Sequence, residues 1–337
     1  MVTGGTGYIG SHTVVELMQS GFDVIIIDNL SNSKEEVADA IARIAGLKPV
    51  FACIDLNDRA ATREFLKVNP VDAVIHFAAF KAVGESVEKP LAYYRNNLIS
   101  LINLLDICRE LEIRNFVFSS SCSVYGDPDH LPINESAPLK PAKSPYANTK
   151  KIGEDILRDT AQTGEIRVIA LRYFNPVGAH PSNLIGENPA GAPLNLFPVI
   201  TQTAAGLRKK IQVFGTDYTS KDGSAVRDYI HVVDVALAHV AALERLLNTG
   251  GGNPFEVFNI GTGSGLSVLE VLHAFEEATG IALPYECVSR REGDVEQVYA
   301  DTSLAASELG WKSRYGLREM ISSAWAWEQV LKERAVR

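Results

Sequence analysis

The sequence predicts an α/β protein with a doubly wound parallel sheet and a smaller C-terminal α/β lobe. Three observations predict it. Short apolar runs alternate with helical patterns in the first half, a glycine-rich turn precedes the first helix, and the composition changes after about residue 175. Because a domain typically takes about 150 residues, a chain of 337 residues has room for two such units.

The strands of the first half are continuous apolar runs, the pattern of strands that are buried on both faces. They cover residues 23–28, 50–54, 72–77, 114–121 and 166–173. Helical patterns lie before and between them, near residues 11–20, 34–46, 58–68, 90–111 and 146–162. Alternating strands and helices imply right-handed crossovers, so we expect a parallel sheet with helices on both faces.

The second half begins with an irregular segment, residues 175–198, that is rich in Pro, Gly and Asn. Long loops of this kind are usually functional. Helical patterns follow near residues 195–207, 232–248, 267–279, 302–309 and 317–334, with strands near 211–214, 256–260 and 284–288. We therefore expect a cofactor-binding domain at 1–175 and a second lobe at 176–337. The boundary is approximate, and we expect each unit to include segments from the other part of the sequence.

The composition excludes several classes of protein. Hydrophobic residues make up 46% and charged residues 22%, a globular balance that excludes disorder, collagen and coiled coil. No apolar run reaches the roughly 18 residues of a membrane span. A net charge of −9 argues against a nucleic-acid partner.

The cysteines and histidines predict neither a disulfide framework nor a metal site. Cys53, Cys108, Cys122 and Cys287 are scattered and form no CxxC pair, and the histidines form no HExxH motif. The N-terminus lacks the pattern of a signal peptide. We therefore expect no metal and a location in the reducing cytoplasm.

The first ten residues predict a dinucleotide site. Gly4, Gly7 and Gly10 form GxxGxxG just before the first helix, where backbone N–H groups and the helix N-terminus can bind a pyrophosphate. Asp28 ends the next strand and can hold the adenosine ribose, although a capping role is its alternative. No arginine follows to receive a 2′-phosphate, so this Rossmann-type pattern favours NAD over NADP.

The segment SPYANTK predicts the catalytic helix. Ser144 and Pro145 are favourable helix-start residues, which puts Tyr146 and Lys150 at i and i+4 on one face. A tyrosine with a pKa of about 10 becomes a usable base when a nearby ammonium stabilises its phenolate. The alternative is a solvated helix face, which the dinucleotide-binding context makes less favourable.

A serine completes the candidate catalytic group. The strand 114–121 ends in three serines at the sheet edge where ligands of such folds bind. A hydroxyl both donates and accepts, so Ser121 can relay a proton to Tyr146. We expect Ser119 and Ser120 to satisfy backbone groups or to pack.

Longer motifs resemble a particular family. They are TGGTGYIGSH (3–12), SSSCSVYGD (119–127), RYFNPVGAHPS (172–182) and RREGD (290–294). With YxxxK they resemble the UDP-galactose 4-epimerases of the extended short-chain dehydrogenase/reductase superfamily, from residue 1 to about 330. The resemblance implies reversible 4-epimerisation of UDP-galactose and UDP-glucose through a 4-keto intermediate, with tightly bound NAD that is recycled.

The resemblance also implies a set of cofactor residues. Around the pyrophosphate turn these are Gly4, Gly7, Tyr8, Ile9 and Gly10. Around the adenosine they are Asp28, Asn29, Leu30, Asn32, Ser33, Asp55 and Leu56. Along the phosphates, the second ribose and the nicotinamide they are Phe77, Ala78, Ala79, Phe80, Lys81, Asn96, Tyr146, Lys150, Tyr173 and Phe174.

A second set is implied for the UDP-sugar substrate. Ser121, Tyr146, Asn175, Asn195 and Leu196 would meet the nucleotide sugar, and Gln212, Val213 and Phe214 would lie along the uracil. Arg227 and Arg291 would clamp the diphosphate, and Asp294 would bind the uridine ribose. Guanidinium groups suit this task because they form paired hydrogen bonds with phosphates.

One position departs from the family pattern. Val298 stands where epimerases restricted to glucose and galactose tend to carry a tyrosine. A smaller side chain would leave room for a 2-acetamido group. We therefore keep a bifunctional or preferential UDP-N-acetylglucosamine/UDP-N-acetylgalactosamine 4-epimerase as the alternative function.

Other activities known for this fold agree less well with the sequence. Dehydratases and decarboxylases need an acid beside the relay serine, and the segment Ser121–Ser123 has none. A simple dehydrogenase would not need the long second lobe. A non-catalytic NAD-binding member remains as a second alternative, opposed by the intact Tyr146, Lys150 and Ser121. The resemblance further implies a homodimer that pairs the helices near 90–111 and 146–162.

Overall fold

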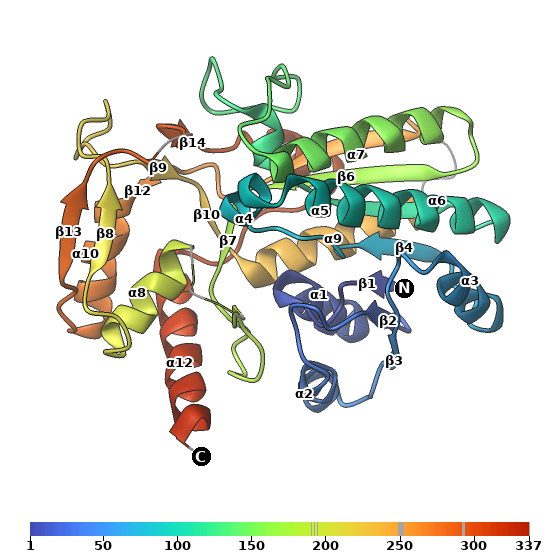
Figure 1. The fold of residues 1–337 in the computed structure, drawn as a ribbon, viewed down its shortest axis with the longest axis horizontal. Coiled ribbons are helices and arrows are strands. Elements are labelled where there is room, and N and C mark those ends of the chain that lie inside the picture. The colour runs from blue at the N-terminus through green and yellow to red at the C-terminus, as the bar shows by residue number, and fades with distance from the viewer. Residues whose placement is uncertain (190, 192, 194, 249–252, 292–293, 337) are drawn as a thin grey trace.

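In this computed structural model, the centre of the larger unit is a seven-stranded sheet (Figure 1). Every pair of neighbouring strands in this sheet is parallel. The structure describes residues 1–336 apart from 190, 192, 194, 249–252 and 292–293. In spatial order the strands are β3 (Val50–Cys53), β2 (Ile25–Asp28), β1 (Val2–Thr3), β4 (Ala73–His76), β5 (Asn115–Ser121), β6 (Arg167–Tyr173) and β11 (Phe255–Ile260). The predicted doubly wound parallel sheet is confirmed.

The order of the strands defines a crevice. From β1 the chain builds outward through β2 and β3, then returns to β4 on the other side of β1. Ligands of doubly wound sheets bind at the carboxyl ends of the strands beside such a switch point. The glycine-rich turn directly follows β1 and therefore lies at this place.

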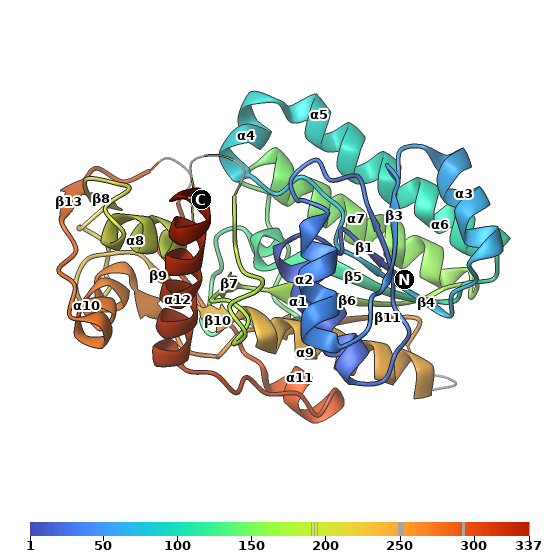
Figure 2. The same ribbon diagram turned by 90° about the horizontal axis from the view of Figure 1, so that it is seen from below.

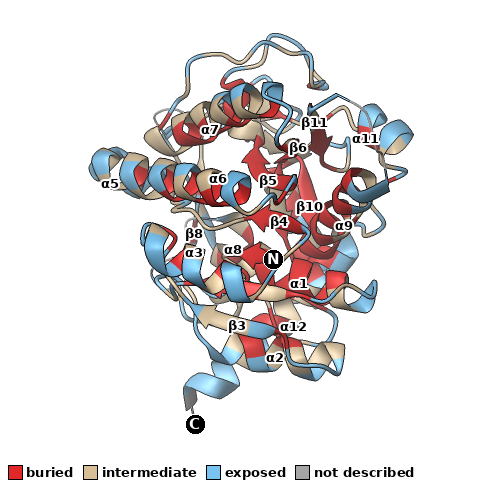
Figure 3. Cartoon of the chain, turned by 90° about the vertical axis from the view of Figure 1, so that its right-hand side faces the viewer, coloured by how far each residue is buried: buried red, intermediate tan, exposed pale blue. Residues whose placement is uncertain are grey.

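Helices cover both faces of the sheet, as Figure 3 shows by their buried inner sides. Along β5, Val117 packs into one core cluster, while Phe116 and Phe118 pack into the other, the period-two alternation of a strand. The cluster on one face includes residues of α1 (Tyr8–Gln19), α2 (Glu36–Ala45) and α9 (Val232–Asn248). The cluster on the other includes residues of α3 (Arg59–Val68), α6 (Ser100–Glu110) and α7 (Pro145–Gln162).

The prediction of one regular helix near residues 90–111 is wrong. It is divided into α5 (Pro90–Tyr94), a π-helical turn (Arg95–Ile99) and α6, and the short α4 (Val83–Glu88) precedes it. The side chain of Asn97 explains the wide turn. It accepts from Phe80 N at 2.8 Å and donates to Phe80 O and Thr149 Oγ1, each at 3.0 Å. π-helical turns are frequent at functional sites.

The smaller lobe lies to the left of the sheet in Figures 1 and 2. Its core gathers apolar residues that include Phe197, Val213 and Phe275. Its elements are α8 (Leu196–Ala204), β8 (Ile211–Phe214), α10 (Val268–Thr279), β13 (Tyr285–Val288) and α12 (Leu317–Val336). By contrast, α9 and β11 come late in the sequence but belong to the sheet unit.

Short strands connect the two units. β7 (Asn175–Val177) pairs with β10 (Tyr229–His231), and β9 (Val226–Arg227) lies between β12 (Leu266–Ser267) and β14 (Gln297–Val298). α11 (Ser303–Glu308) contacts β11. The buried carboxylate of Asp228, between β9 and β10, accepts main-chain N–H bonds from Thr262, Gly263 and Ala300. None of the helices that the structure describes is both long and apolar enough to cross a membrane.

Buried histidines predict acid sensitivity. Burial lowers the pKa of His12 and His76 to about 3, and the pKa of His231 and His239 to about 4. The unfolded chain binds these protons at a pKa near 6.5, so stability is complete above that pH and falls as the pH drops toward 4. Urea unfolding at pH 7 and pH 5 should differ by on the order of 1 kcal/mol or more per buried histidine.

The replacement His239→Leu isolates the contribution of one buried histidine to this pH dependence. It should reduce the difference in unfolding free energy between the two pH values by roughly one such increment. An unchanged difference would contradict the assignment of His239 as a buried neutral group.

Candidate active site

The glycine turn is shaped by close backbone contacts. Gly4 has φ +67°, and a Cβ there would lie 2.8 Å from the backbone N of Ala78. A Cβ on Gly10 would lie 2.2 Å from the carbonyl oxygen of Gly4. Gly7 precedes α1, and no side chain caps this helix end. The first N–H groups of α1 are therefore available at the crevice, as a bound pyrophosphate requires.

Asp28 links two loops at the edge of the crevice. It ends β2, and its carboxylate accepts from Thr6 N at 3.1 Å, Leu30 N at 2.9 Å and the Ser33 hydroxyl at 3.3 Å. Leu30 has the left-handed φ of 58° that this turn requires. The carboxylate thus performs the capping role weighed from the sequence and lies beside the glycine turn. The sequence analysis missed Thr6, because its place within the glycine motif was the only signal that pointed to it.

A chain of polar side chains joins the ends of β2 and β3 to the π-helical turn. Asn29 donates to Asp55 at 3.1 Å, Asn57 donates to the same carboxylate at 2.9 Å, and Asn57 also donates to Asn96 at 3.3 Å. The structure therefore brings together three of the predicted adenosine-side and cofactor residues. Asn32 is exposed, and Leu56 is buried.

The segment after β4 follows the crevice toward the second lobe. The ring of Phe77 lies 4.6 Å from that of His239, and Ala78 N donates to Thr3 Oγ1 at 3.4 Å. Ala79 is half-buried. Lys81 is half-exposed; its Nζ lies 5.8 Å from the ring centroid of Tyr8 and 3.4 Å from a carboxylate oxygen of Glu187.

Helix α7 places Tyr146 and Lys150 on one face. The Ser144 side chain accepts from Ala147 N at 3.2 Å, so the helix starts as predicted. Lys150 is buried, and its Nζ donates to Ser119 O at 2.6 Å. Burial lowers the pKa of Lys150 to about 8, and the nearby Glu154 opposes that fall.

Glu154 is a site residue that the sequence analysis missed. It is fully buried, forms an ion pair with Arg172 and accepts from the Ser120 hydroxyl at 2.5 Å. The available signal was its spacing, because Tyr146, Lys150 and Glu154 follow one another at four-residue steps on a helix. Its negative charge supports the ammonium form of Lys150 in a buried place.

The three serines at the end of β5 have different partners. The Ser119 hydroxyl bonds to the hydroxyl of Tyr173, and the Ser120 hydroxyl bonds to Glu154. Ser121 accepts from the hydroxyl of Ser123 at 2.9 Å and is hydrogen-bonded to Tyr146. Ser121 is therefore the serine beside the tyrosine, the position that a proton relay needs.

Tyr146 requires a cation to act as a base. Burial raises the pKa of Tyr146 to about 12, and the hydrogen bond with Ser121 opposes this rise. The hydroxyl is therefore protonated at neutral pH. A positive charge close to the phenol lowers this pKa, which is the contribution expected of Lys150 and of an oxidised nicotinamide.

Two arginines and one aspartate converge in the smaller lobe. Arg227 Nη2 lies 3.6 Å and Arg291 Nη2 lies 2.9 Å from the same Oδ1 of Asp294. Arg227 is oriented by Nη1 bonds to the carbonyls of Val226 and Glu296, and Arg291 lies over the ring of Phe214. The structure thus gathers the residues expected at a diphosphate and a uridine.

The remaining predicted substrate residues are distributed around this group. Asn175 starts β7, and Asn195 precedes α8 and donates to Glu187 at 2.8 Å. The side chain of Val213 lies in the lobe core, and only its neighbours on β8 reach outward. Of the other predicted substrate positions, Gln212 is exposed, Leu196 is half-buried and Val298 is buried. Of the predicted cofactor positions, Ile9 is half-buried, and Phe174 is buried in the same cluster as Val298.

The close contact at Gly10 gives a direct test of the turn. Gly10→Ala forces the start of α1 away from Gly4, so it should cost about 1–3 kcal/mol and weaken NAD binding. Thermal melting with and without added NAD measures both effects. Gly84→Ala is the matched control, since a Cβ there meets nothing within 4 Å. Wild-type melting and NAD binding by Gly10→Ala would contradict the assignment.

Comparison with known proteins places these features in context. A model of the NAD dependent epimerase/dehydratase family matches residues 1–261. The UDP-glucose 4-epimerase of Bacillus subtilis is 49% identical over 329 residues, which are 97% of this chain and 96% of that protein. UDP-glucose 4-epimerase 2 of Arabidopsis thaliana is 48% identical over 97% of this chain and 94% of that protein.

Solved structures are similar over nearly the whole chain. The UDP-glucose 4-epimerase of Stenotrophomonas maltophilia, solved with bound NAD and formylated UDP-arabinopyranose, is 48% identical with a TM-score of 0.96, covering 99% of this chain and 98% of that one. The enzyme of Bifidobacterium longum, in complex with NAD+ and UDP, is 44% identical with a TM-score of 0.93 and covers 98% and 97%.

Proposed function

The chain belongs to the NAD dependent epimerase/dehydratase family, and we propose that it interconverts UDP-galactose and UDP-glucose by inverting C4 of the hexose. One observation carries the proposal. Tyr146 lies beside Ser121 at the carboxyl end of β5, on the same helix face as a buried Lys150. Similarity to UDP-glucose 4-epimerases over nearly the full chain supports it.

The cofactor of this reaction is NAD. The residues fit it because the glycine turn leaves no room for a Cβ at Gly4 or Gly10, and Asp28 closes the far side of that turn. Lys150 and Lys81 supply positive charge along the crevice. When bound, NAD supplies a hydride acceptor and, in the return step, a hydride donor.

The side chains of this protein move and hold the proton. Tyr146 takes the proton of the 4-hydroxyl, with Ser121 bridging between the two oxygens, and returns a proton after the sugar presents its other face. Lys150, one helical turn after Tyr146 with its Nζ on Ser119 O, would supply positive charge to the phenol side of the helix. The negative charge of Glu154, which pairs with Arg172, supports the ammonium form of Lys150. The sugar passes through a 4-keto form, and the half-buried position of Tyr146 beside the buried Ser121 limits the access of water to it.

The smaller lobe holds the part of the substrate that does not react. Arg227 and Arg291 bind the diphosphate through paired N–H groups, and Asp294 is then free to accept from the uridine ribose. A firm grip at the diphosphate allows the hexose to turn about its linkage. Specific binding and sugar rotation are therefore assigned to different parts of the site.

Assembly and location are further parts of the proposal. Exposed apolar side chains lie along α4 to α6, where a homodimer would bury them: Val83, Val87, Leu91, Ile99 and Ile102. This supports pairing through α5–α6 and α7. All four cysteines are free, which supports a reducing cytoplasm. We also propose a domain boundary at residues 175/176, with α9 and β11 contributed to the sheet unit from beyond it.

The direct test uses the purified protein and UDP-galactose without added cofactor. Anion exchange should show conversion to a stable mixture of UDP-galactose and UDP-glucose. Tyr146→Phe removes the proton acceptor and should lower the turnover rate about 10²–10⁴-fold without loss of bound NAD. Tyr285→Phe, at an exposed position of β13, is the matched control. Absence of conversion, with NAD added and with N-acetylated substrates, would support a non-catalytic member.

The substrate range is tested at Val298. This side chain is 8% exposed and packs in one cluster with Phe174, so a tyrosine there would fill space next to a predicted nicotinamide neighbour. We expect the wild type to turn over UDP-N-acetylgalactosamine and Val298→Tyr to lose that activity at least about 10-fold, because the acetamido group needs the volume.

Turnover of UDP-galactose by the same Val298→Tyr preparation controls for folding. Equal rates of wild type and variant on UDP-N-acetylgalactosamine would contradict the role of Val298 and leave the main function unaffected.

A further inference from the structure

Residues 178–187 form a narrow loop that is fixed at its first residue. Ala179 and Gly186 form an antiparallel bridge, and His180 N donates to Ile185 O at 3.1 Å. The hydroxyl of Tyr8 donates to Gly178 O at 2.6 Å. Because Tyr8 begins α1, the loop is tied directly to the start of the glycine-turn helix.

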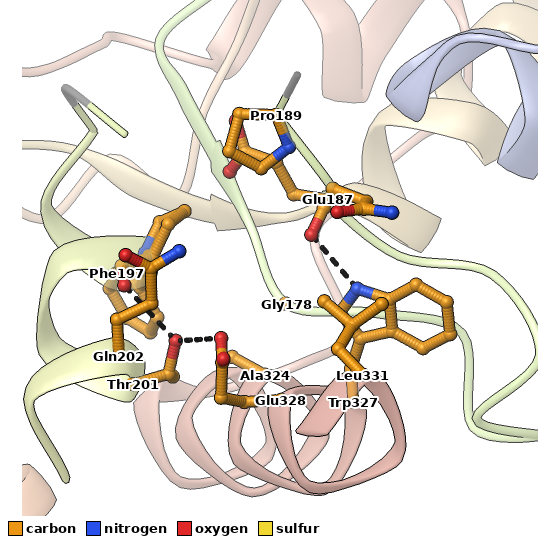
Figure 4. Close-up of a pocket in the computed structure, with 12 residues that line it drawn as sticks. Gly178, Glu187, Pro189, Phe197, Thr201, Gln202, Ala324, Trp327, Glu328 and Leu331 are labelled. Atoms are coloured by element: carbon orange, nitrogen blue, oxygen red, sulfur yellow. Dashed lines mark hydrogen bonds between the residues drawn. The ribbon is translucent and has the colours of Figure 1, made fainter. Parts of the chain in front are cut away.

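The other end of the loop is fixed by α12. Figure 4 shows Trp327 of α12 against this segment, with its Nε1 donating to Glu187 O at 2.8 Å. A Cβ on Gly186 would lie 2.6 Å from the ring of Trp327, so the indole packs on bare backbone. The backbone at Gly186 and Glu187 is therefore fixed by Trp327 and by the Ala179–Gly186 bridge, which gives the carboxylate of Glu187 a defined place.

The carboxylate of Glu187 joins the two units. Its Oε1 accepts from Asn195 Nδ2 at 2.8 Å and lies 3.4 Å from Lys81 Nζ. Lys81 follows β4 of the sheet unit, and Asn195 precedes α8 of the smaller lobe. The side chain of Glu187 is 11% exposed and that of Lys81 is 49% exposed. The fixed partner is therefore the carboxylate, and it determines where the flexible ammonium stands.

The position of Lys81 makes this contact relevant to the cofactor. Its Nζ lies 5.8 Å from the ring centroid of Tyr8, at the start of α1. The Lys81–Glu187 pair thus crosses from the glycine turn to the lobe. An ion pair with one partly buried member is screened less than a pair at the surface.

We propose that Glu187 is a positioning residue that couples cofactor retention to occupancy of the substrate lobe. One oxygen serves both neighbours. When a nucleotide phosphate takes over the Asn195 amide, Oε1 is left to the Lys81 ammonium, and the pair across the crevice strengthens. Filling the lobe then slows the exit of NAD. This inference rests on the proposed function, which supplies the two ligands.

A purely structural role makes a different prediction. If Glu187 only joined the two units, its replacement would lower the melting temperature and leave the effect of nucleotide on NAD release unchanged. If it couples the sites, the nucleotide effect itself falls. By linkage, NAD must also change the affinity for nucleotide by the same factor, which gives a second readout.

The experiment measures exchange of bound NAD against labelled NAD, with and without UDP, on the protein as purified. UDP is chosen because it lacks a sugar and cannot react. We expect UDP to slow exchange about 5-fold or more in the wild type, within the usual range of coupling between sites. Glu187→Gln keeps an oxygen for Asn195 but removes the negative charge that pairs with Lys81, and it should reduce this factor to less than about 2.

Two further variants make the result specific. Lys81→Met removes the other member of the pair and should reduce the factor to the same extent. Glu256→Gln is the matched control, because it removes a similarly buried carboxylate that pairs with Arg245 away from the crevice. It should keep the wild-type factor.

Each outcome decides the question. A wild-type factor in Glu187→Gln, or an exchange rate of the wild type that is independent of UDP, overturns the coupling. If the same wild-type preparation converts UDP-galactose, the proposed function stands even then. A preparation that neither binds NAD nor converts UDP-galactose overturns both.

Discussion

The close approach of α1 to the ends of β1 and β4 is the constraint on which the site depends. A Cβ on Gly4 would collide with the backbone of Ala78, and a Cβ on Gly10 would collide with the carbonyl of Gly4, so neither position accepts a side chain. This contact aims the uncapped start of α1 into the crevice at the switch point. It also sets Thr6 against Asp28 and the Tyr8 hydroxyl against Gly178, which connects the turn to the second lobe.

Burial creates the second requirement, because ionisable groups inside the protein need partners. Lys150 is buried at the end of β5 with a lowered pKa, and Glu154 lies near it while pairing with Arg172. Removing one member of such a group would leave an uncompensated buried charge. The same burial holds Tyr146 in its neutral form until positive charge is placed beside it. The reaction is thereby linked to the presence of the oxidised cofactor.

Periodicity and turn chemistry predicted the central sheet, because strands buried on both faces have continuous apolar runs. The helix start at Ser144–Pro145 and the glycine turn could also be predicted, because both depend on residues that are close in sequence. The π-helical turn was not, since it depends on bonds from Asn97 to Phe80 and Thr149, which are distant in sequence. Glu187 was missed because its partners, Lys81 and Asn195, come together only when the two units meet.

The central claim is that C4 of the sugar loses and regains its hydrogen inside one closed site. It is tested most directly with UDP-galactose that carries deuterium at C4, incubated with the protein in ordinary water. Mass spectrometry and NMR of the UDP-glucose product should show the deuterium retained at C4. Loss of the label to water would contradict the account, because it would mean that the hydrogen at C4 leaves as a proton rather than passing to a bound cofactor and back.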